Sequence, residues 1–128
     1  MMDSVFAMLS EDPDMGPRLR DADVPQRLEF DDVGLVLNVR PARAGEQGNL
    51  WWTWSDDIDW TPRVRMSMSS ETANRYFQGH ENLLYAIARR RITTSGDLKA
   101  ALELVPITKP VGKRYRELVA ARYPHLAV

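Results

Sequence analysis

The chain contains no cysteine, and this absence removes disulfide bonds, cysteine nucleophiles and thiolate-bound metals from consideration. Such a sequence fits a reducing compartment, and we expect a cytoplasmic location. Positive charge is not in excess either: the formal net charge is −1, so nucleic acid is not an expected partner. No apolar run approaches the ~20 residues that span a bilayer, and the N-terminal stretch carries acids where a secretory signal needs basic residues.

Patterns that would indicate a catalytic, cofactor or metal site are missing as well. There is no Gly-x-Ser-x-Gly sequence and no glycine-rich phosphate-binding loop. The only histidines are His80 and His125, and His80 has no second histidine at the spacing of a zinc-binding helix. The acids Asp56, Asp57 and Asp59 do not follow the calcium-loop pattern and predict a solvated turn. We therefore expect no catalytic residue, no cofactor and no metal.

The length and composition predict one folded domain. The 128 residues are 44% hydrophobic and 27% charged, which is typical of a globular chain. A chain of this size buries roughly two-thirds of its unfolded surface, so a real core can form. We place the single domain at residues 1–128, with a helical extension at residues 1–27.

Alternating apolar and polar residues predict a sheet. In the clearest example Val64, Met66 and Met68 face inward, while Arg63 and Arg65 face outward. Trp52 and Trp54 are likewise expected on the same inward face. The first four strands suit an antiparallel meander with one wet face, on which Arg40 is expected. The predicted strands are Gln26–Phe30, Gly34–Arg40, Asn49–Ser55, Arg63–Ser69 and Arg91–Ser95.

Two short helices are predicted in the middle of the chain, at Ser70–Gln78 and Asn82–Arg90. Apolar residues recur there at three- and four-residue intervals, the period of a helix with one buried face. Ser69 is an N-cap residue type, and Gly79 predicts a bend between the two helices.

Further helices are predicted at Met2–Ser10, after Asp97 and at Val111–Tyr123. The order of elements indicates an α+β fold with helices on one face of a largely antiparallel sheet. Pro106 and Pro110 are expected to interrupt the helix after Asp97. A segment with two prolines allows two alternatives: a lid that moves with the last helix, or a static connection between helices.

A basic cluster, Arg89-Arg90-Arg91, ends the second of the paired helices. It has two interpretations: it complements the helix dipole, or it attracts anionic lipid head groups. A transient contact with a membrane surface is therefore among the expected partners.

A series of motifs extends from about Leu28 to Leu126. In order they are the strand-to-helix junction VRMSMSSETANRYFQG, Asn82-Leu83 with AIARRRI, Gly96, and ALELVPITKPVGKRYREL. This series resembles the lipid-binding domain of the sterol carrier protein type two family, and is most similar to its short bacterial single-domain members. Arg90 departs from the family pattern, which often has glycine at that position.

The resemblance implies a five-stranded, mostly antiparallel sheet covered on one face by helices, with an apolar tunnel between the layers. It also implies binding and transport of sterols, fatty acids or acyl-CoA esters without catalysis. We assign the tunnel lining to the bulky apolar residues of the inward faces: Trp52, Trp54, Met66, Met68, Tyr76, Phe77, Leu83, Leu84, Ile87, Leu102 and Val105.

Two alternatives stay open beside the lipid carrier. The first is an enzyme or accessory protein acting on a hydrophobic small molecule, such as a polyketide or terpenoid, in the same cavity. Its candidate polar groups are Tyr76, His80, Glu81 and Asp97. The second is a structural or regulatory domain whose aromatic residues form a solid core. The sequence does not distinguish these, and it gives no oligomeric state.

Overall fold

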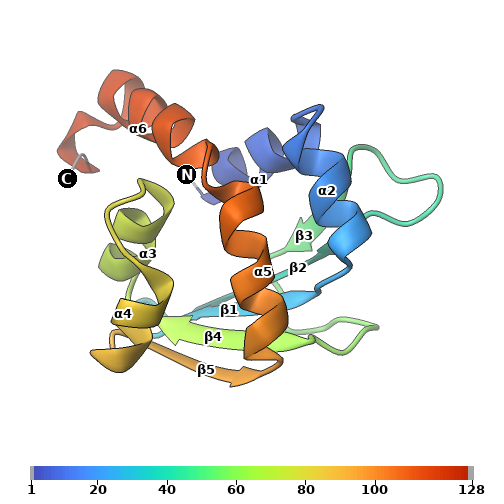
Figure 1. The fold of residues 1–128 in the computed structure, drawn as a ribbon, viewed down its shortest axis with the longest axis horizontal. Coiled ribbons are helices and arrows are strands. Elements are labelled where there is room, and N and C mark those ends of the chain that lie inside the picture. The colour runs from blue at the N-terminus through green and yellow to red at the C-terminus, as the bar shows by residue number, and fades with distance from the viewer. Residues whose placement is uncertain (1, 127–128) are drawn as a thin grey trace.

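The computed structural model describes residues 2–126 and shows an α+β fold, as the sequence predicts (Figure 1). Each predicted strand lies within two residues of its observed bounds. In chain order the elements are α1 Met2–Glu11, α2 Met15–Ala22, β1 Gln26–Phe30, β2 Leu35–Pro41, β3 Leu50–Thr53, β4 Val64–Met68, α3 Ser70–Phe77, α4 Leu83–Ala88, β5 Ile92–Gly96, α5 Leu98–Thr108, α6 Val111–Arg122 and the 3₁₀ turn η1 Pro124–Leu126.

The five strands form one sheet in the order β3-β2-β1-β4-β5. Three of the four pairings are antiparallel, but β1 and β4 run parallel, with Leu28 opposite Met66. The predicted meander is therefore wrong. After β3, residues 54–63 carry the chain back across the sheet to the far side of β1. Alternation within strands sets which face each side chain takes, but it does not determine which strands pair.

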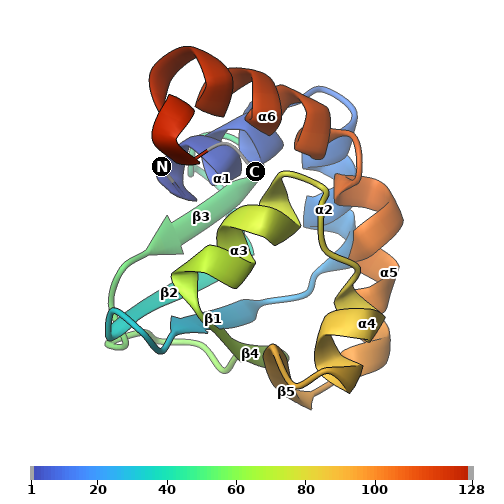
Figure 2. The same cartoon turned by 90° about the vertical axis from the view of Figure 1, so that its left-hand side faces the viewer.

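The helices lie on one side of the sheet in both views (Figure 1, Figure 2). The core lies between the two layers, and Val64, Met66 and Met68 are buried there as the alternation predicts. Phe6 of α1 and Leu19 of α2 belong to the same core, so both N-terminal helices contribute to it. Apolar burial on this face is the main source of stability.

Local capping residues determine where the two middle helices begin. The Ser69 hydroxyl accepts a hydrogen bond from the Thr72 N–H at 3.1 Å, and the Asn82 side chain accepts one from the Tyr85 N–H at 3.0 Å. Gly79 between them has φ +80°, a conformation that glycine adopts without steric cost. The predicted bend is confirmed.

Helix α5 continues through Pro106 to Thr108, so the predicted interruption at Pro106 is wrong. A proline removes one N–H donor from the helix, which leaves one carbonyl of the previous turn without its partner. Pro106 is exposed, so water can reach this part of the helix. The following turn stays closed, because Lys109 N–H donates to the Val105 carbonyl at 3.0 Å. The helix breaks only before Pro110, which caps α6.

The outer face of the sheet is not uniformly wet. Arg40 points away from the helices, yet it is only 7% exposed, so the expectation of a solvated arginine is wrong. Its guanidinium lies 4.6 Å from the Trp51 ring and 5.1 Å from the Trp60 ring, and pairs with Glu46 at 2.6 Å. The loops on either side of β3 thus cover this part of the sheet.

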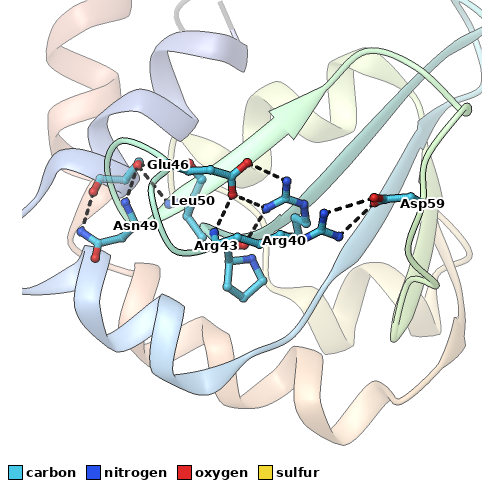
Figure 3. A network of polar contacts seen from close by, with 8 residues as sticks. Arg40, Arg43, Glu46, Asn49, Leu50 and Asp59 are labelled. Atoms are coloured by element: carbon cyan, nitrogen blue, oxygen red, sulfur yellow. Dashed lines mark hydrogen bonds and ion pairs between the residues drawn. The ribbon is translucent and has the colours of Figure 1, made fainter.

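Figure 3 shows how the same loops are fastened to each other and to α1. Arg43 pairs with Asp59 at 2.9 Å, which joins the loop before β3 to the loop after it. The N–H groups of Asn49 and Leu50 donate to the Ser10 hydroxyl of α1 at 3.0 and 3.1 Å. The segment that covers the outer face therefore also holds α1 in place.

The Arg40–Glu46 pair predicts a specific acid sensitivity. Hydrogen bonds from the Arg40 guanidinium and then from the Arg43 N–H lower the pKa of Glu46 to about 2. A lowered pKa stabilises the fold at pH values above 4.5, and this contribution is lost as pH falls from 4.5 to about 2. We expect Glu46→Gln to reduce stability at neutral pH and to converge with the wild type in acid, measured by urea unfolding across this pH range.

Glu103→Gln, at an exposed acid on α5, is the control for that series. Its urea midpoint should follow the wild type at every pH. A Glu46→Gln variant whose deficit stayed constant from neutral pH to pH 2 would contradict the argument.

A buried polar cluster joins α3, α6 and η1. Asn74 Oδ1 accepts from Gln78 Nε2 at 2.9 Å and from the Tyr115 hydroxyl at 3.2 Å, and Asn74 Nδ2 donates to the Leu126 carbonyl at 2.8 Å. Desolvation raises the pKa of Tyr115 to about 12, which keeps its hydroxyl a donor at neutral pH.

We expect Asn74→Ala to lower the free energy of unfolding by about 2–3 kcal/mol, because it removes three hydrogen bonds and leaves the buried Tyr115 hydroxyl without its acceptor. Tyr115→Phe removes one donor only and should cost about 1 kcal/mol. Chemical denaturation of both variants measures the difference. Equal losses for the two would show that the cluster does not depend on Asn74.

Candidate functional site

A cavity lies between the inner face of the sheet and the helices. Its volume is about 60 Å³, which is room for only a few water molecules. Both layers contribute to its wall. The lining residues are Phe6, Leu9, Leu19, Val24, Gln26, Leu28, Val39, Arg40, Pro41, Leu50, Met66, Met68, Tyr76, Phe77, Leu83, Ile92, Ala101, Leu104 and Thr108.

The cavity wall is mostly apolar. Its polar residues are Gln26, Thr108 and Arg40, and the guanidinium of Arg40 lies against Trp51 and Trp60. The Thr108 hydroxyl donates to the Leu104 carbonyl at 3.1 Å and is therefore already paired. Burial raises the pKa of the Tyr76 hydroxyl, so this group is neutral over the ordinary pH range. An enclosed space of this kind favours hydrocarbon over water, because water needs two to four polar partners.

A second hollow opens to solvent between the α3–α4 connection and the junction of α5 with α6. Its volume is about 390 Å³, within the size range of small-molecule sites. Its lining is more polar than that of the cavity. The residues are Tyr76, Phe77, Gly79, His80, Glu81, Asn82, Leu83, Val105, Thr108, Lys109, Val111 and Gly112. We call this hollow the outer cleft.

Four residues line both hollows, and we call them the partition: Tyr76, Phe77, Leu83 and Thr108. Two of the four are aromatic, and their rings meet edge to face with centroids 5.2 Å apart. Phe77 also meets Phe6 of α1 at 5.9 Å, so the partition belongs to a larger aromatic cluster.

The end of the outer cleft is closed by a close backbone contact. A Cβ on Gly112 would lie 3.5 Å from Gly79 Cα, so α6 begins directly against the α3–α4 turn. Arg116 fixes this contact by donating to the Gln78 carbonyl at 2.7 Å. On α6, Arg114 also pairs with Asp12 at 2.7 Å.

The structure brings about half of the predicted lining residues to the two hollows. Those that line the cavity are Met66, Met68, Tyr76, Phe77 and Leu83, and Val105 lines the outer cleft. Trp52, Ile87 and Leu102 pack against the core without lining either hollow. Trp54 is 39% exposed at the edge of the sheet, where its indole donates to Asp3 at 2.9 Å.

The inward placement of Leu84 is wrong, because its side chain is 55% exposed. Helix α4 is only six residues long, and Leu83 and Ala86 already occupy its buried face. Adjacent residues on a helix are turned by about a quarter of a circle or more, so Leu83 and Leu84 do not share that face.

Several lining residues come from segments whose sequence pattern is only a weak indication of a site. Phe6 and Leu9 come from α1, Leu19 from α2, and Ala101 and Leu104 from α5. The spacing of Phe6 and Leu9 fits one face of a helix, which is the signal that could have placed them in the site. Nothing in the sequence showed that α1 packs over the sheet.

The four polar residues of the enzyme alternative do not meet at one point. Tyr76, His80 and Glu81 line the outer cleft, but Asp97 does not. Asp97 caps α5 by accepting from the Ala100 N–H at 3.0 Å. In the part of the chain that the structure describes, no group of three or more His, Asp or Glu side chains is placed to hold a metal ion.

Two of the three acids in the loop after β3 pair with arginines. Asp56 pairs with Arg27 at 3.2 Å and Asp59 pairs with Arg43.

Across residues 2–126, no helix has both the length and the apolar character that crossing a membrane requires.

Comparison with known proteins finds similarity in structure only. No protein-family profile matches the chain, and no curated protein sequence does. Among solved structures, the UbiJ-SCP2 ubiquinone synthesis protein has a TM-score of 0.63 at 10% identity and covers 85% of each chain. The apo form of sterol carrier protein 2 from Yarrowia lipolytica has a TM-score of 0.57 at 12% identity, covering 86% of this chain and 88% of that one.

The stereoselective inverting sec-alkylsulfatase Pisa1 from Pseudomonas sp. contains a similar unit, with a TM-score of 0.65 at 18% identity. The match covers 84% of this chain but only 16% of the alkylsulfatase chain. Together these structures establish a sterol-carrier-protein-like fold. The resemblance seen in the sequence is therefore confirmed at the level of the fold.

The partition predicts a sharp difference between two neighbouring leucines. Leu83→Ala should lower the free energy of unfolding by about 2–4 kcal/mol, since it removes buried methyl groups from a packed wall. Leu84→Ala should change it by less than about 0.5 kcal/mol, because that side chain contacts water. Thermal or urea unfolding of the two variants checks the assignment, which comparable losses would contradict.

Proposed function

We propose that this protein is a non-catalytic carrier that binds the apolar part of a lipid, such as a sterol or fatty acyl chain, between its sheet and its helices. One observation carries the proposal: the same four side chains line both an apolar cavity and an open cleft. The similarity to sterol carrier protein and ubiquinone synthesis domains agrees with a hydrophobic ligand. No polar constellation in the two hollows supports catalysis in preference to binding.

Binding requires the partition to move. A cavity of about 60 Å³ is too small for an acyl chain, but displacement of Tyr76 and Phe77 would connect it to the cleft of about 390 Å³. The driving force is burial of the lipid, about 0.8 kcal/mol for each CH₂ before the cost of ordering both partners. Aromatic side chains suit such a partition because their packing can be exchanged for contact with the hydrocarbon.

The outer cleft suits the polar end of the same ligand. Lys109 supplies a cation, and His80 and Asn82 supply hydrogen-bonding groups at its rim. Access through the cleft needs no movement of α6. The lid alternative would have to break the Arg114–Asp12 and Arg116–Gln78 contacts, so we place the access path at the partition.

Ala101 offers a direct test, because it lies on α5 and lines the cavity. Ala101→Leu extends a side chain into the space that the lipid tail would occupy, while keeping a good helix former. We expect its affinity for a fluorescent fatty acid to fall about tenfold, since displacing two methylene groups costs roughly 1.6 kcal/mol. Displacement titration of protein stripped of lipid measures this.

The matched control is Ala121→Leu, the same substitution at an exposed position on α6. It should bind the fatty acid as the wild type does. Native mass spectrometry of the purified protein before and after lipid extraction provides an independent readout. If the wild type neither retains lipid nor binds the probe, or if both variants bind equally, the proposed function fails.

A further inference from the structure

Helix α4 presents two large apolar side chains to solvent at the periphery of the molecule, at the lower left in Figure 1. Leu84 is 55% exposed and Tyr85 is 50% exposed. Leu83, on the opposite side of the same short helix, belongs to the partition of the binding site. The exposed face of α4 thus lies directly behind the path by which we expect a ligand to reach the cavity.

Arginines surround these two side chains. The guanidinium carbons of Arg89 and Arg91 lie 5.1 and 5.4 Å from the centre of the Tyr85 ring. Residues 82–92 contain no acid. The adjacent acid, Glu81, has a side chain only 4% exposed and is paired with Arg91. This corner of the molecule therefore combines exposed apolar surface with a local excess of positive charge.

Arg90 adds a third cation in an unfavourable backbone conformation. Its φ is 60°, in the left-handed region that non-glycine residues adopt at a steric cost. Glycine would occupy this position without that cost. Within residues 2–126, neither Arg89 nor Arg90 is held in an ion pair, so both remain available to an external anion. We call the exposed residues Leu84, Tyr85, Arg89, Arg90 and Arg91 the α4 corner.

We propose that the α4 corner docks on the surface of an anionic lipid bilayer. Leu84 and the Tyr85 ring would enter the interface between head groups and acyl chains, and the arginines would bind lipid phosphates. Two apolar side chains form a patch far smaller than the roughly 800 Å² per partner of a stable protein interface. A bilayer needs no such area, because basic residues add their own attraction.

This inference goes beyond the proposed function and does not require cargo to be bound. It predicts how the docked protein is oriented: the partition, which includes Leu83, would face the membrane. Docking and lipid binding are measured separately, so either can fail alone.

The chain carries its own matched control. Val33, in the turn between β1 and β2, and Leu35, the first residue of β2, are 53% and 49% exposed, almost the same as the pair on α4. Their neighbours are Asp31 and Asp32 instead of arginines. If docking depended on apolar exposure alone, both sites would bind vesicles. If it depends on positive charge as well, only the α4 corner will.

The absence of native cysteine allows a single label at either place. Leu84→Cys and Val33→Cys, each carrying a polarity-sensitive fluorophore, are mixed with phosphatidylcholine vesicles, with and without phosphatidylglycerol. We expect a blue shift at position 84 on the anionic vesicles, reversed by salt, and none at position 33. No shift at position 84, equal shifts at both positions, or equal shifts on neutral vesicles would overturn the proposal.

Arg90→Gly separates docking from folding. It should raise thermal stability, because glycine relieves the left-handed backbone, yet weaken binding to anionic vesicles about fivefold, because each basic residue near such a surface contributes about 1 kcal/mol. Arg89→Glu should weaken vesicle binding further while leaving fatty acid affinity unchanged. Unchanged vesicle binding by both variants, measured by flotation of lipid-stripped protein, would show that the arginines do not hold the bilayer.

Discussion

Strands β1 and β4 run parallel at the centre of the sheet, and much of the architecture follows from that pairing. Parallel neighbours cannot be joined by a tight turn, so the chain completes β2 and β3 before it returns. The returning segment, residues 54–63, crosses to the far side of β1 and covers part of the outer face. With that face covered by loops, the helices collect on the other face, where the cavity lies.

Much of the fold could be predicted because the strands alternate clearly. The inward side chains of β4, Val64, Met66 and Met68, are buried as the pattern requires. Pairing could not be predicted, since it depends on contacts between residues far apart in sequence. Arg40 illustrates the same limit. The alternation predicts correctly that it lies on the outer face of the sheet, but not that it is buried. Its burial depends on Trp60, which is twenty residues further along the chain and which the crossing loop places over it.

The binding site is less predictable than the fold because its geometry is decided by small rotations and distant elements. Leu83 and Leu84 are equally apolar, and a helix of six residues gives periodicity too little length to separate them. Phe6 reaches the site from α1, a helix whose Ser10 hydroxyl accepts hydrogen bonds from Asn49 and Leu50 at the start of β3. A residue's hydrophobicity therefore predicts that it is buried far better than it predicts what it faces.

The cavity is small because side chains from the two layers pack tightly around it. Its wall is closed by aromatic rings in contact with one another, Phe6 on Phe77 and Phe77 on Tyr76. Such rings keep the empty state dry and dense, and they can separate without breaking a hydrogen bond. Stability in the empty state and room for a ligand thus draw on the same side chains.

The four tryptophans all lie within residues 51–60, at one edge of the sheet. The indoles of Trp52 and Trp54 both donate to the same Asp3 oxygen, each at 2.9 Å, while Trp51 and Trp60 flank Arg40. Intrinsic emission from this protein will consequently report the seating of α1 on β3 and the closure of the neighbouring loops. Tryptophan fluorescence will therefore report changes at that edge of the sheet and will not report changes at the α4 corner, which contains no tryptophan.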